Sequence, residues 1–211
     1  MRRGSRTFPL AGCRHAGYAV FFRLLTERYP DVAHFLYGHS LGGLLVLTYV
    51  LRSRVGLNGV VVTGPALRSP IHEQKVKALM ARALGSIAPS VLLPDGLVVT
   101  DISHDPAVIT AYRNDPLVHD RVSLGFGKSG LSATDYTWKH AGEFAPPLLL
   151  MHGTADRITY PSSSRDFAEL AAKNNQDVLL KLWDGMYHEV HNKPHKEQVF
   201  KCMIDWLGTH S

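Results

Sequence analysis

The chain has 211 residues and 45% of them are hydrophobic, so it is long and apolar enough to bury a core and to fold as one domain (1–211) with an insertion. After a cluster of arginines before residue 15, the net charge of +5 is spread along the sequence, and no basic stripe indicates nucleic-acid binding. Contact with an anionic membrane surface is compatible with this charge. The two cysteines, Cys13 and Cys202, form neither a disulfide framework nor a metal-binding pair.

Residues 1–16 are basic, contain glycine and proline, and lack periodicity, which predicts a loose tail. The letters RTFPLAGC end like a lipoprotein processing site, but the apolar stretch is too short for a signal peptide and contains Pro9. No window approaches the roughly twenty apolar residues of a membrane span. We therefore expect a cytoplasmic or peripherally membrane-associated protein.

Two helices and two strands are predicted in the first third of the chain. Apolar residues recur at helical spacing over residues 17–29, and Pro30 ends that helix. A short buried strand is predicted at 34–37 and a helix at 41–52, where Gly42 and Gly43 permit close packing. The β-branched run at 58–63 is predicted to be a buried parallel strand.

The segment 65–146 is richer in proline, serine and histidine, with helical patterns near 72–88 and 106–113, and we predict a cap insertion there. Four apolar residues within it line either a path for lipid or a simple core: Leu92, Leu93, Leu97 and Val98. After the cap, strands are predicted at 147–151 and 178–183, and helices at 163–173 and 195–207. Because strands alternate with helices, the predicted fold class is α/β, with a mostly parallel sheet flanked by helices.

A nucleophile is predicted at the end of the first strand. Residues 38–42, GHSLG, fit the pattern G-x-S-x-G, in which the serine lies on a strained turn between a strand and a helix and glycines relieve the crowding. An apolar strand precedes Ser40 and a helix follows it, as this geometry requires. The backbone N–H of Leu41, at the start of that helix, is then placed to donate to an oxyanion.

A base and a carboxylate are needed to activate such a serine. Asp156 follows the third strand and His188 follows the fourth, and active residues of open parallel sheets gather at these carboxyl strand ends. The three side chains are therefore expected to converge. Asp184 is the rival acid, and His191 is the rival base.

A metal centre is not expected in this region. His188, His191 and His195 lie close together in sequence, but HEVH is one residue short of H-E-x-x-H and Pro194 interrupts any helix shared by all three. His39, beside the nucleophile, is expected to pack or to hydrogen-bond locally.

In these motifs the chain resembles the α/β-hydrolase superfamily, and within it the monoacylglycerol lipase and lysophospholipase-like group, often labelled serine aminopeptidase S33. The similar segments are FLYGHSLGGLL, DPLV, LLLMHGTADRITYP and GMYHEVHNKP, which span the chain from about residue 17 onward. The resemblance implies Ser40 as nucleophile, Asp156 as triad acid and His188 as base, without a metal or cofactor. It also implies that the cap shapes an acyl-binding tunnel and that residues 152–153 form a structural turn.

The chain departs from this family before the elbow. In the family, several strands precede the elbow and a loop after the third strand supplies a second oxyanion donor, usually in a His-Gly context. No such motif precedes Ser40, so the N-terminal strands and the second donor are expected to be missing, as in a truncated product or an incomplete gene model. The elbow strand would then be a sheet edge, which predicts self-association through that edge.

The expected function is hydrolysis of carboxylic esters of lipid-like substrates, monoacylglycerol or lysophospholipid, through an acyl-serine intermediate. A peptidase or another hydrolase on the same scaffold is an alternative, because one fold hosts many activities. The alternative from a different class is a catalytically impaired fragment that binds an acyl ligand or a partner.

Overall fold

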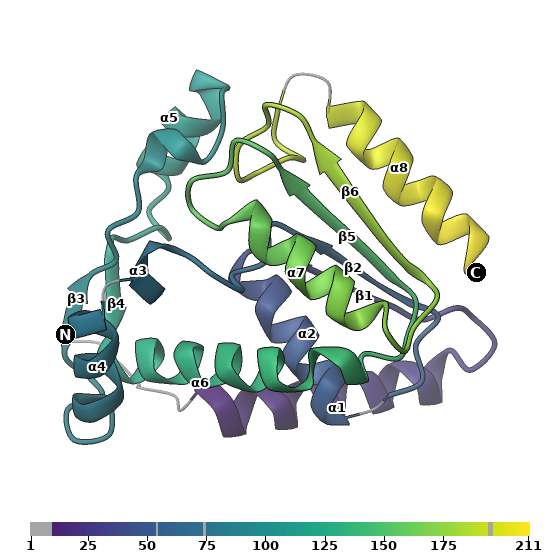
Figure 1. Cartoon of the computed structure of the whole chain (residues 1–211), viewed down its shortest axis with the longest axis horizontal. Coiled ribbons are helices and arrows are strands. Elements are labelled where there is room, and N and C mark those ends of the chain that lie inside the picture. Colours follow the sequence, from purple (N-terminus) through teal and green to yellow (C-terminus); the bar gives the residue numbers. More distant parts are fainter. Residues whose placement is uncertain (1–9, 54, 74, 194–195) are drawn as a thin grey trace.

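The computed structural model describes residues 10–53, 55–73, 75–193 and 196–211 (Figure 1). Its main sheet has four parallel strands in the order β1-β2-β5-β6. They are β1 (Phe35–His39), β2 (Gly59–Thr63), β5 (Leu148–Gly153) and β6 (Val178–Trp183). The α/β fold class predicted from the alternation of strands and helices is confirmed.

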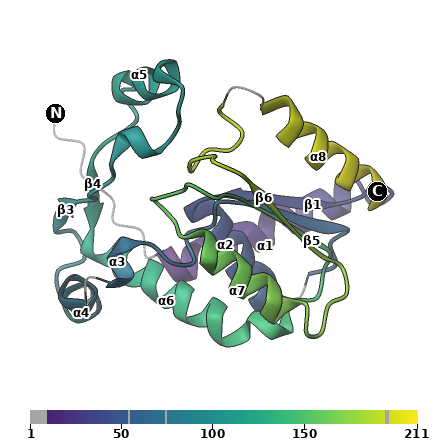
Figure 2. The same ribbon diagram turned by 45° about the horizontal axis from the view of Figure 1, so that its top comes forward.

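Helices cover both faces of this sheet (Figure 2). One face carries α1 (Leu10–Arg28), α2 (Leu41–Ser53), α6 (Leu124–His140) and α7 (Pro161–Ala171), and the other carries α8 (Lys196–Thr209). The inner strands β2 and β5 are buried at every position, which explains why their sequences are continuous apolar runs.

The two faces of the sheet contribute to separate hydrophobic cores. Val60 and Val62 of β2 lie in the core with Phe167 of α7, whereas Val61 between them lies in the core with Trp206 of α8. Successive side chains of a strand point to opposite faces, so a single run of valines supplies both cores.

The first helix is longer than expected. α1 begins at Leu10, so part of the segment 1–16 predicted as a loose tail belongs to a helix, and residues 1–9 lie outside the described part of the chain. From Tyr18 onward the helix packs on the sheet layer: the ring of Tyr18 lies 5.4 Å from that of Tyr49, and Phe22 lies edge-on to His34 at 5.9 Å. The glycine and Pro9 in this segment obscured the helical start.

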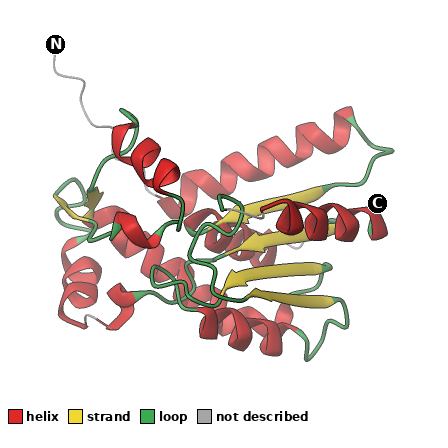
Figure 3. Cartoon of the chain, turned by 90° about the horizontal axis from the view of Figure 1, so that it is seen from above, coloured by secondary structure: helices red, strands yellow, loops and turns green. Residues whose placement is uncertain are grey.

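Part of the segment predicted to be a cap lies to one side of the carboxyl ends of the strands, and we call this part the cap (Figures 1 and 3). It comprises α3 (Pro70–Glu73), α4 (Lys75–Leu84), the antiparallel pair of β3 (Leu92–Pro94) and β4 (Arg121–Ser123), and, between these two strands, η1 (Val99–Asp101) and α5 (Pro106–Asn114). Leu92, Leu93 and Val98 are exposed, at 53%, 38% and 55%, so these cap residues are not part of a simple core.

Within the segment 65–146, predicted to be a cap, the helix α6 packs against the main body. Leu131 and Thr137 of α6 are buried, and the hydroxyl of Thr137 lies 2.8 Å from that of Thr48 on α2. The short helix η2 (Ala141–Glu143) follows and leads into β5. Three glycines in the first half of α6 weaken its helical propensity and its apolar pattern, so tertiary packing rather than local sequence decides this helix.

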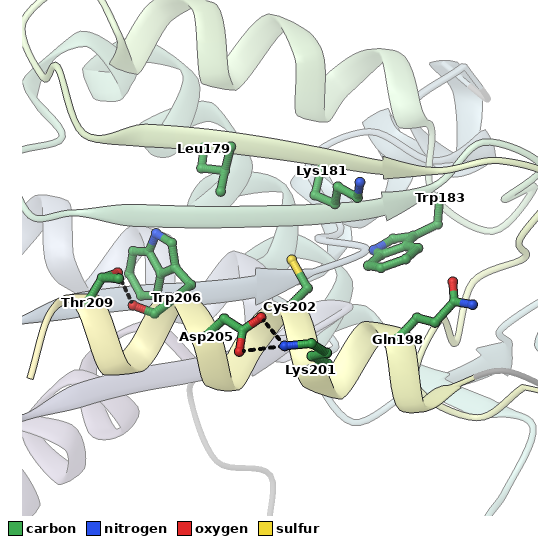
Figure 4. A pocket seen from close by; sticks show the side chains of 9 residues that line it. All are labelled: Leu179, Lys181, Trp183, Gln198, Lys201, Cys202, Asp205, Trp206 and Thr209. Atoms are coloured by element: carbon green, nitrogen blue, oxygen red, sulfur yellow. Dashed lines mark hydrogen bonds and ion pairs between the residues drawn. The ribbon is translucent and has the colours of Figure 1, made fainter.

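Both outer strands of the described sheet have one unpaired edge, since β1 pairs only with β2 and β6 only with β5. Beside β6 a groove of about 540 Å³ runs between that strand and α8 (Figure 4). Trp183, Cys202 and Trp206 are among its lining residues, and none of the predicted catalytic residues is. The groove is therefore separate from the site described next.

Candidate active site

Ser40 lies on a strained turn where β1 ends and α2 begins. Its φ is +53°, and within the described chain it is the one non-glycine residue with a positive φ. Its N–H donates to the carbonyl of Thr63 at 2.9 Å, and its own carbonyl accepts from Ala66 N–H at 3.0 Å. These bonds hold a backbone conformation that residues other than glycine rarely adopt, as a nucleophile elbow requires.

Small residues make this elbow sterically feasible. A Cβ at Gly38 would lie 2.5 Å from the carbonyl oxygen of Gly42, and a Cβ at Gly43 would lie 2.7 Å from Cγ1 of Val62. Gly38 and Gly43 are therefore required by close approach of α2 to the sheet. At Gly42 itself a Cβ would meet nothing within 4 Å, so the close packing predicted for both helix glycines occurs only at Gly43.

Leu41 is the first residue of α2. The first N–H groups of a helix have no acceptor within it, and they carry the positive end of the helix dipole. The backbone N–H of Leu41 is therefore a donor beside the serine hydroxyl.

Asp156 lies in the loop after β5 and is 5% exposed. Its Oδ1 accepts from the backbone N–H groups of Ile158 at 2.8 Å and Thr159 at 3.0 Å. Its Oδ2 lies 2.7 Å from Nδ1 of His188 and 3.0 Å from Nε2 of His152. Burial acts to raise the pKa of this carboxyl, but the hydrogen bonds from the two histidines outweigh burial and hold its pKa well below the usual range.

His188 lies in the loop between β6 and α8 and is also 5% exposed. Because Nδ1 donates to Asp156, Nε2 is the nitrogen left to act on a hydroxyl. Gly64, at φ +50°, makes room for the imidazole, since a Cβ there would lie 3.2 Å from Nδ1. Within the described residues no hydrogen bond joins His188 to the hydroxyl of Ser40, and such contacts often form only when substrate is bound.

The alternative acid, Asp184, and the alternative base, His191, make other contacts than Asp156 and His188 do. Asp184 is exposed and accepts from the hydroxyl of Thr154 at 3.1 Å. His191 makes no contact with Asp156: its ring lies edge-on to His39 at 4.7 Å, and its buried Nδ1 has no hydrogen-bond partner among the described residues. The pair that the structure brings together is therefore Asp156 with His188.

His39 packs against His188 as well, with ring centroids 4.7 Å apart. Its Nδ1 lies 3.0 Å from the carbonyl and 2.9 Å from the hydroxyl of Thr63, which agrees with the predicted local hydrogen bonding. Burial, and then repulsion by His188 and His191, lowers the pKa of His39 to about 3. Three imidazoles thus meet at the elbow, yet no group of metal-binding side chains is found in the described ranges, and His195 lies outside them.

His152, predicted to be part of a structural turn, also contacts the carboxylate of Asp156, which the sequence did not predict. The ring is fully buried, with Nδ1 2.7 Å from the hydroxyl of Ser164 and Nε2 3.0 Å from Asp156. Gly153 beside it has no room for a Cβ, because the carbonyl oxygens of Met186 and Tyr187 lie against it. A histidine at the end of a buried apolar strand, four residues before the predicted acid, was the available signal for this second support.

Comparison with known proteins agrees with this architecture. A family model described as serine aminopeptidase, S33, matches residues 15–195. Over 183 residues the chain is 31% identical to a monoacylglycerol lipase of Mycolicibacterium smegmatis, and over 174 residues it is 30% identical to phospholipase YtpA of Bacillus subtilis. The crystal structure of a monoacylglycerol lipase from Paleococcus ferrophilus is similar with a TM-score of 0.83 and 35% identity, covering 93% of this chain and 76% of that one.

These relatives are longer than the chain. The match covers 86% of this chain but 64% of the M. smegmatis protein, and 82% of this chain but 66% of the B. subtilis protein. An uncharacterized abhydrolase domain-containing protein of Dictyostelium discoideum is 39% identical over 178 residues, which are 84% of this chain and 19% of that protein.

Proposed function

Because the chain belongs to the serine aminopeptidase S33 family of α/β-hydrolases, we propose that it hydrolyses carboxylic esters of lipid-like substrates through an acyl-serine intermediate. Monoacylglycerol and lysophospholipid are the substrates we propose, since similar proteins are named monoacylglycerol lipase and phospholipase. The observation that carries the proposal is the buried pair of Asp156 and His188, whose imidazole packs on His39, the residue before a serine held at positive φ.

The proposed reaction uses three side chains. Nε2 of His188 takes the proton of the Ser40 hydroxyl while the oxygen attacks the ester carbonyl carbon, and Asp156 stabilises the imidazolium that forms. The tetrahedral oxyanion faces the N–H of Leu41. The imidazolium then gives its proton to the leaving alcohol, the carbon–oxygen bond breaks, and the acyl group stays on Ser40. His188 next takes a proton from water while the water oxygen attacks the acyl carbonyl carbon. The imidazolium then returns this proton to Oγ of Ser40 as the bond between Oγ and the acyl carbon breaks and the fatty acid leaves.

Among the described residues, Leu41 supplies the oxyanion donor that we assign. One donor of this kind contributes about a hundredfold to a thousandfold in rate, so the N–H of Leu41 is expected to stabilise the tetrahedral intermediate substantially.

A fluorophosphonate probe tests the proposal, because its phosphoryl group stands in for the acyl carbonyl under attack. Labelling of the wild type, followed by intact mass, is expected to add one probe and to disappear in Ser40→Ala and His188→Ala. Asp156→Asn should slow labelling by about ten-thousandfold, because the base then lacks the partner that sets its tautomer.

Asp184→Asn is the matched control, since Asp184 is exposed and does not contact His188. It should label at the wild-type rate. Folded wild-type protein that does not label would overturn the proposed chemistry and favour an acyl-binding or partner-binding module. Turnover of matched amides in preference to esters would favour a peptidase.

We also propose peripheral contact with lipid through the cap. Val76, Leu79, Met80 and Leu84 are exposed and recur at helical spacing on α4, so they form one apolar face, which we call the α4 face. Of the helices in the described ranges, none is long and apolar enough to cross a membrane. An amphipathic element of this kind lies on a bilayer surface rather than spanning it.

A further inference from the structure

The loop that carries His188 is bonded to the base of the cap. The segment 102–104, between η1 and α5, runs beside it: Glu189 N–H donates to the carbonyl of Ile102 at 2.9 Å, and the Ser103 hydroxyl donates to the carbonyl of Asn192 at 2.6 Å. Ile102 and Ser103 are both buried, at 2% and 0% exposed. Two backbone positions that follow His188 are thus held by a segment about ninety residues earlier in the chain.

A third contact between the same two segments is made by side chains. Lys193 is 5% exposed, and its Nζ lies 2.7 Å from Nδ1 of His104. The same ammonium lies 4.3 Å from the ring centroid of Tyr187, on which the His104 ring stacks at 3.5 Å with an interplanar angle of 27°. Lys193 and His104 therefore both hold Tyr187, the residue that immediately precedes His188.

Packing alone does not explain a lysine at this position. In the described part of the chain no carboxylate lies within ion-pair distance of Lys193. Burial lowers the pKa of Lys193 to about 8, and the charge of Asp156 offsets only part of this effect. A buried ammonium without a carboxylate in contact costs stability, which an apolar side chain of similar length would avoid. The ammonium of Lys193 can only donate, so Nδ1 of His104 must accept with its lone pair. The contact therefore fixes both the tautomer and the orientation of the His104 ring.

We propose that Lys193 is a positioning residue, which acts through His104 and Tyr187 to hold the loop of His188 against the base of the cap and so keeps Nε2 of His188 aligned with Ser40. This rests on the proposed function, since the alignment matters for a base that acts on Ser40. Misplacement of a catalytic group by about 1 Å costs about a hundredfold in rate, so partial release of the loop should lower kcat by about tenfold or more.

The test compares Lys193→Met, which keeps length and removes the donor, with Lys193→Arg, which keeps donor and charge. Lys201→Met is the matched control, because Lys201 is an exposed lysine of α8 that pairs with Asp205. With the soluble ester p-nitrophenyl butyrate, we expect Lys193→Met to lower kcat about tenfold with KM little changed. Lys193→Arg should recover most of this loss, and Lys201→Met should behave as the wild type. A purely structural lysine would instead give a lower melting temperature with unchanged kcat.

A second measurement does not depend on turnover. The proton between His188 Nδ1 and Asp156 should give a downfield NMR signal in protein with labelled histidine, unchanged in Lys193→Arg and shifted or broadened in Lys193→Met. Unchanged kcat and signal in Lys193→Met would overturn the positioning role. If the wild type cleaves no ester but the NMR signal still differs between the wild type and Lys193→Met, the proposed function is wrong, whereas the role of Lys193 in positioning the His188 loop is supported. Should Lys193→Met not fold, His104→Phe removes the acceptor, keeps a ring on Tyr187, and carries the same test.

Discussion

His39 shows what burial of ionisable groups at the elbow costs. It lies directly before Ser40, and its ring centroid is 4.7 Å from those of His188 and His191. Burial, and then repulsion by these two histidines, lowers its pKa to about 3. In the unfolded chain an imidazole takes up a proton below about pH 6.5. The free energy of unfolding should therefore fall as the pH drops from 6.5 towards 3, by about 1.4 kcal/mol per pH unit for each such group.

His39→Gln tests this at pH 7.5 and pH 5 by urea unfolding, since glutamine can still hydrogen-bond to Thr63. The variant should lose less stability between the two pH values than the wild type. Asp156 does not interfere in this window: its pKa is lowered, so its stabilising effect is lost only when the pH falls below the ordinary carboxyl range. Identical losses in both proteins would show that His39 is accessible to protons in the folded state.

At the scale of elements, α4 differs from the helices of the main body. Its Ala81 is buried and Arg82 forms two hydrogen bonds, at 2.6 and 3.1 Å, with Asp135 of α6, so the helix is fixed to the body on one side. The α4 face points away from that attachment, with Val76 72% and Leu79 67% exposed. An apolar face of this kind on an attached helix is typical of an interaction surface.

The double variant Val76→Ser, Leu79→Ser should reduce hydrolysis of a long-chain monoester in phospholipid vesicles several-fold, because less apolar area enters the bilayer. Hydrolysis of p-nitrophenyl butyrate in solution should be unchanged. Ile204→Ser, at a 66% exposed position on α8, is the control and should alter neither rate. An equal loss of rate on both substrates would show that the substitutions disturb the packing of the cap, and it would contradict membrane contact through the α4 face.

At the scale of the whole molecule, the open edge of β1 is the feature with the clearest consequence for solution behaviour. Among the residues that the structure describes, backbone groups of this strand pair with β2 on one side only, and Tyr37 on it is 50% exposed. An apolar edge strand of this kind pairs readily with another chain, and charged residues on an edge oppose this. We expect two copies of the chain to associate through β1.

Sedimentation over a range of concentrations should therefore show a mass that rises towards that of a dimer. Tyr37→Lys should shift the protein towards monomer, whereas Tyr29→Lys, at a tyrosine of similar exposure just after α1, should not. A wild type that stays monomeric at high concentration would refute pairing through this edge.

The sequence by itself determined the parts that depend on local pattern. Apolar runs identified the four strands of the main sheet. The runs of β2 and β5 are continuous, because a strand buried on both faces needs apolar side chains at every position. The G-x-S-x-G pattern located the strained turn at Ser40, where the first glycine, Gly38, has no room for a Cβ. The order of serine, aspartate and histidine in loops after successive strands then placed the candidate site at one edge, since parallel strands end on the same side.

Only the tertiary structure decided what depends on contacts between distant segments. The glycines of α6 hide a helix that forms because Leu131 and Thr137 find partners in the main body. His152 supports Asp156, and Lys193 meets His104, only after the loops have come together. No local pattern encodes such pairings, because the free energy that selects them comes from burial and hydrogen bonds across the fold and not from the preference of any single segment.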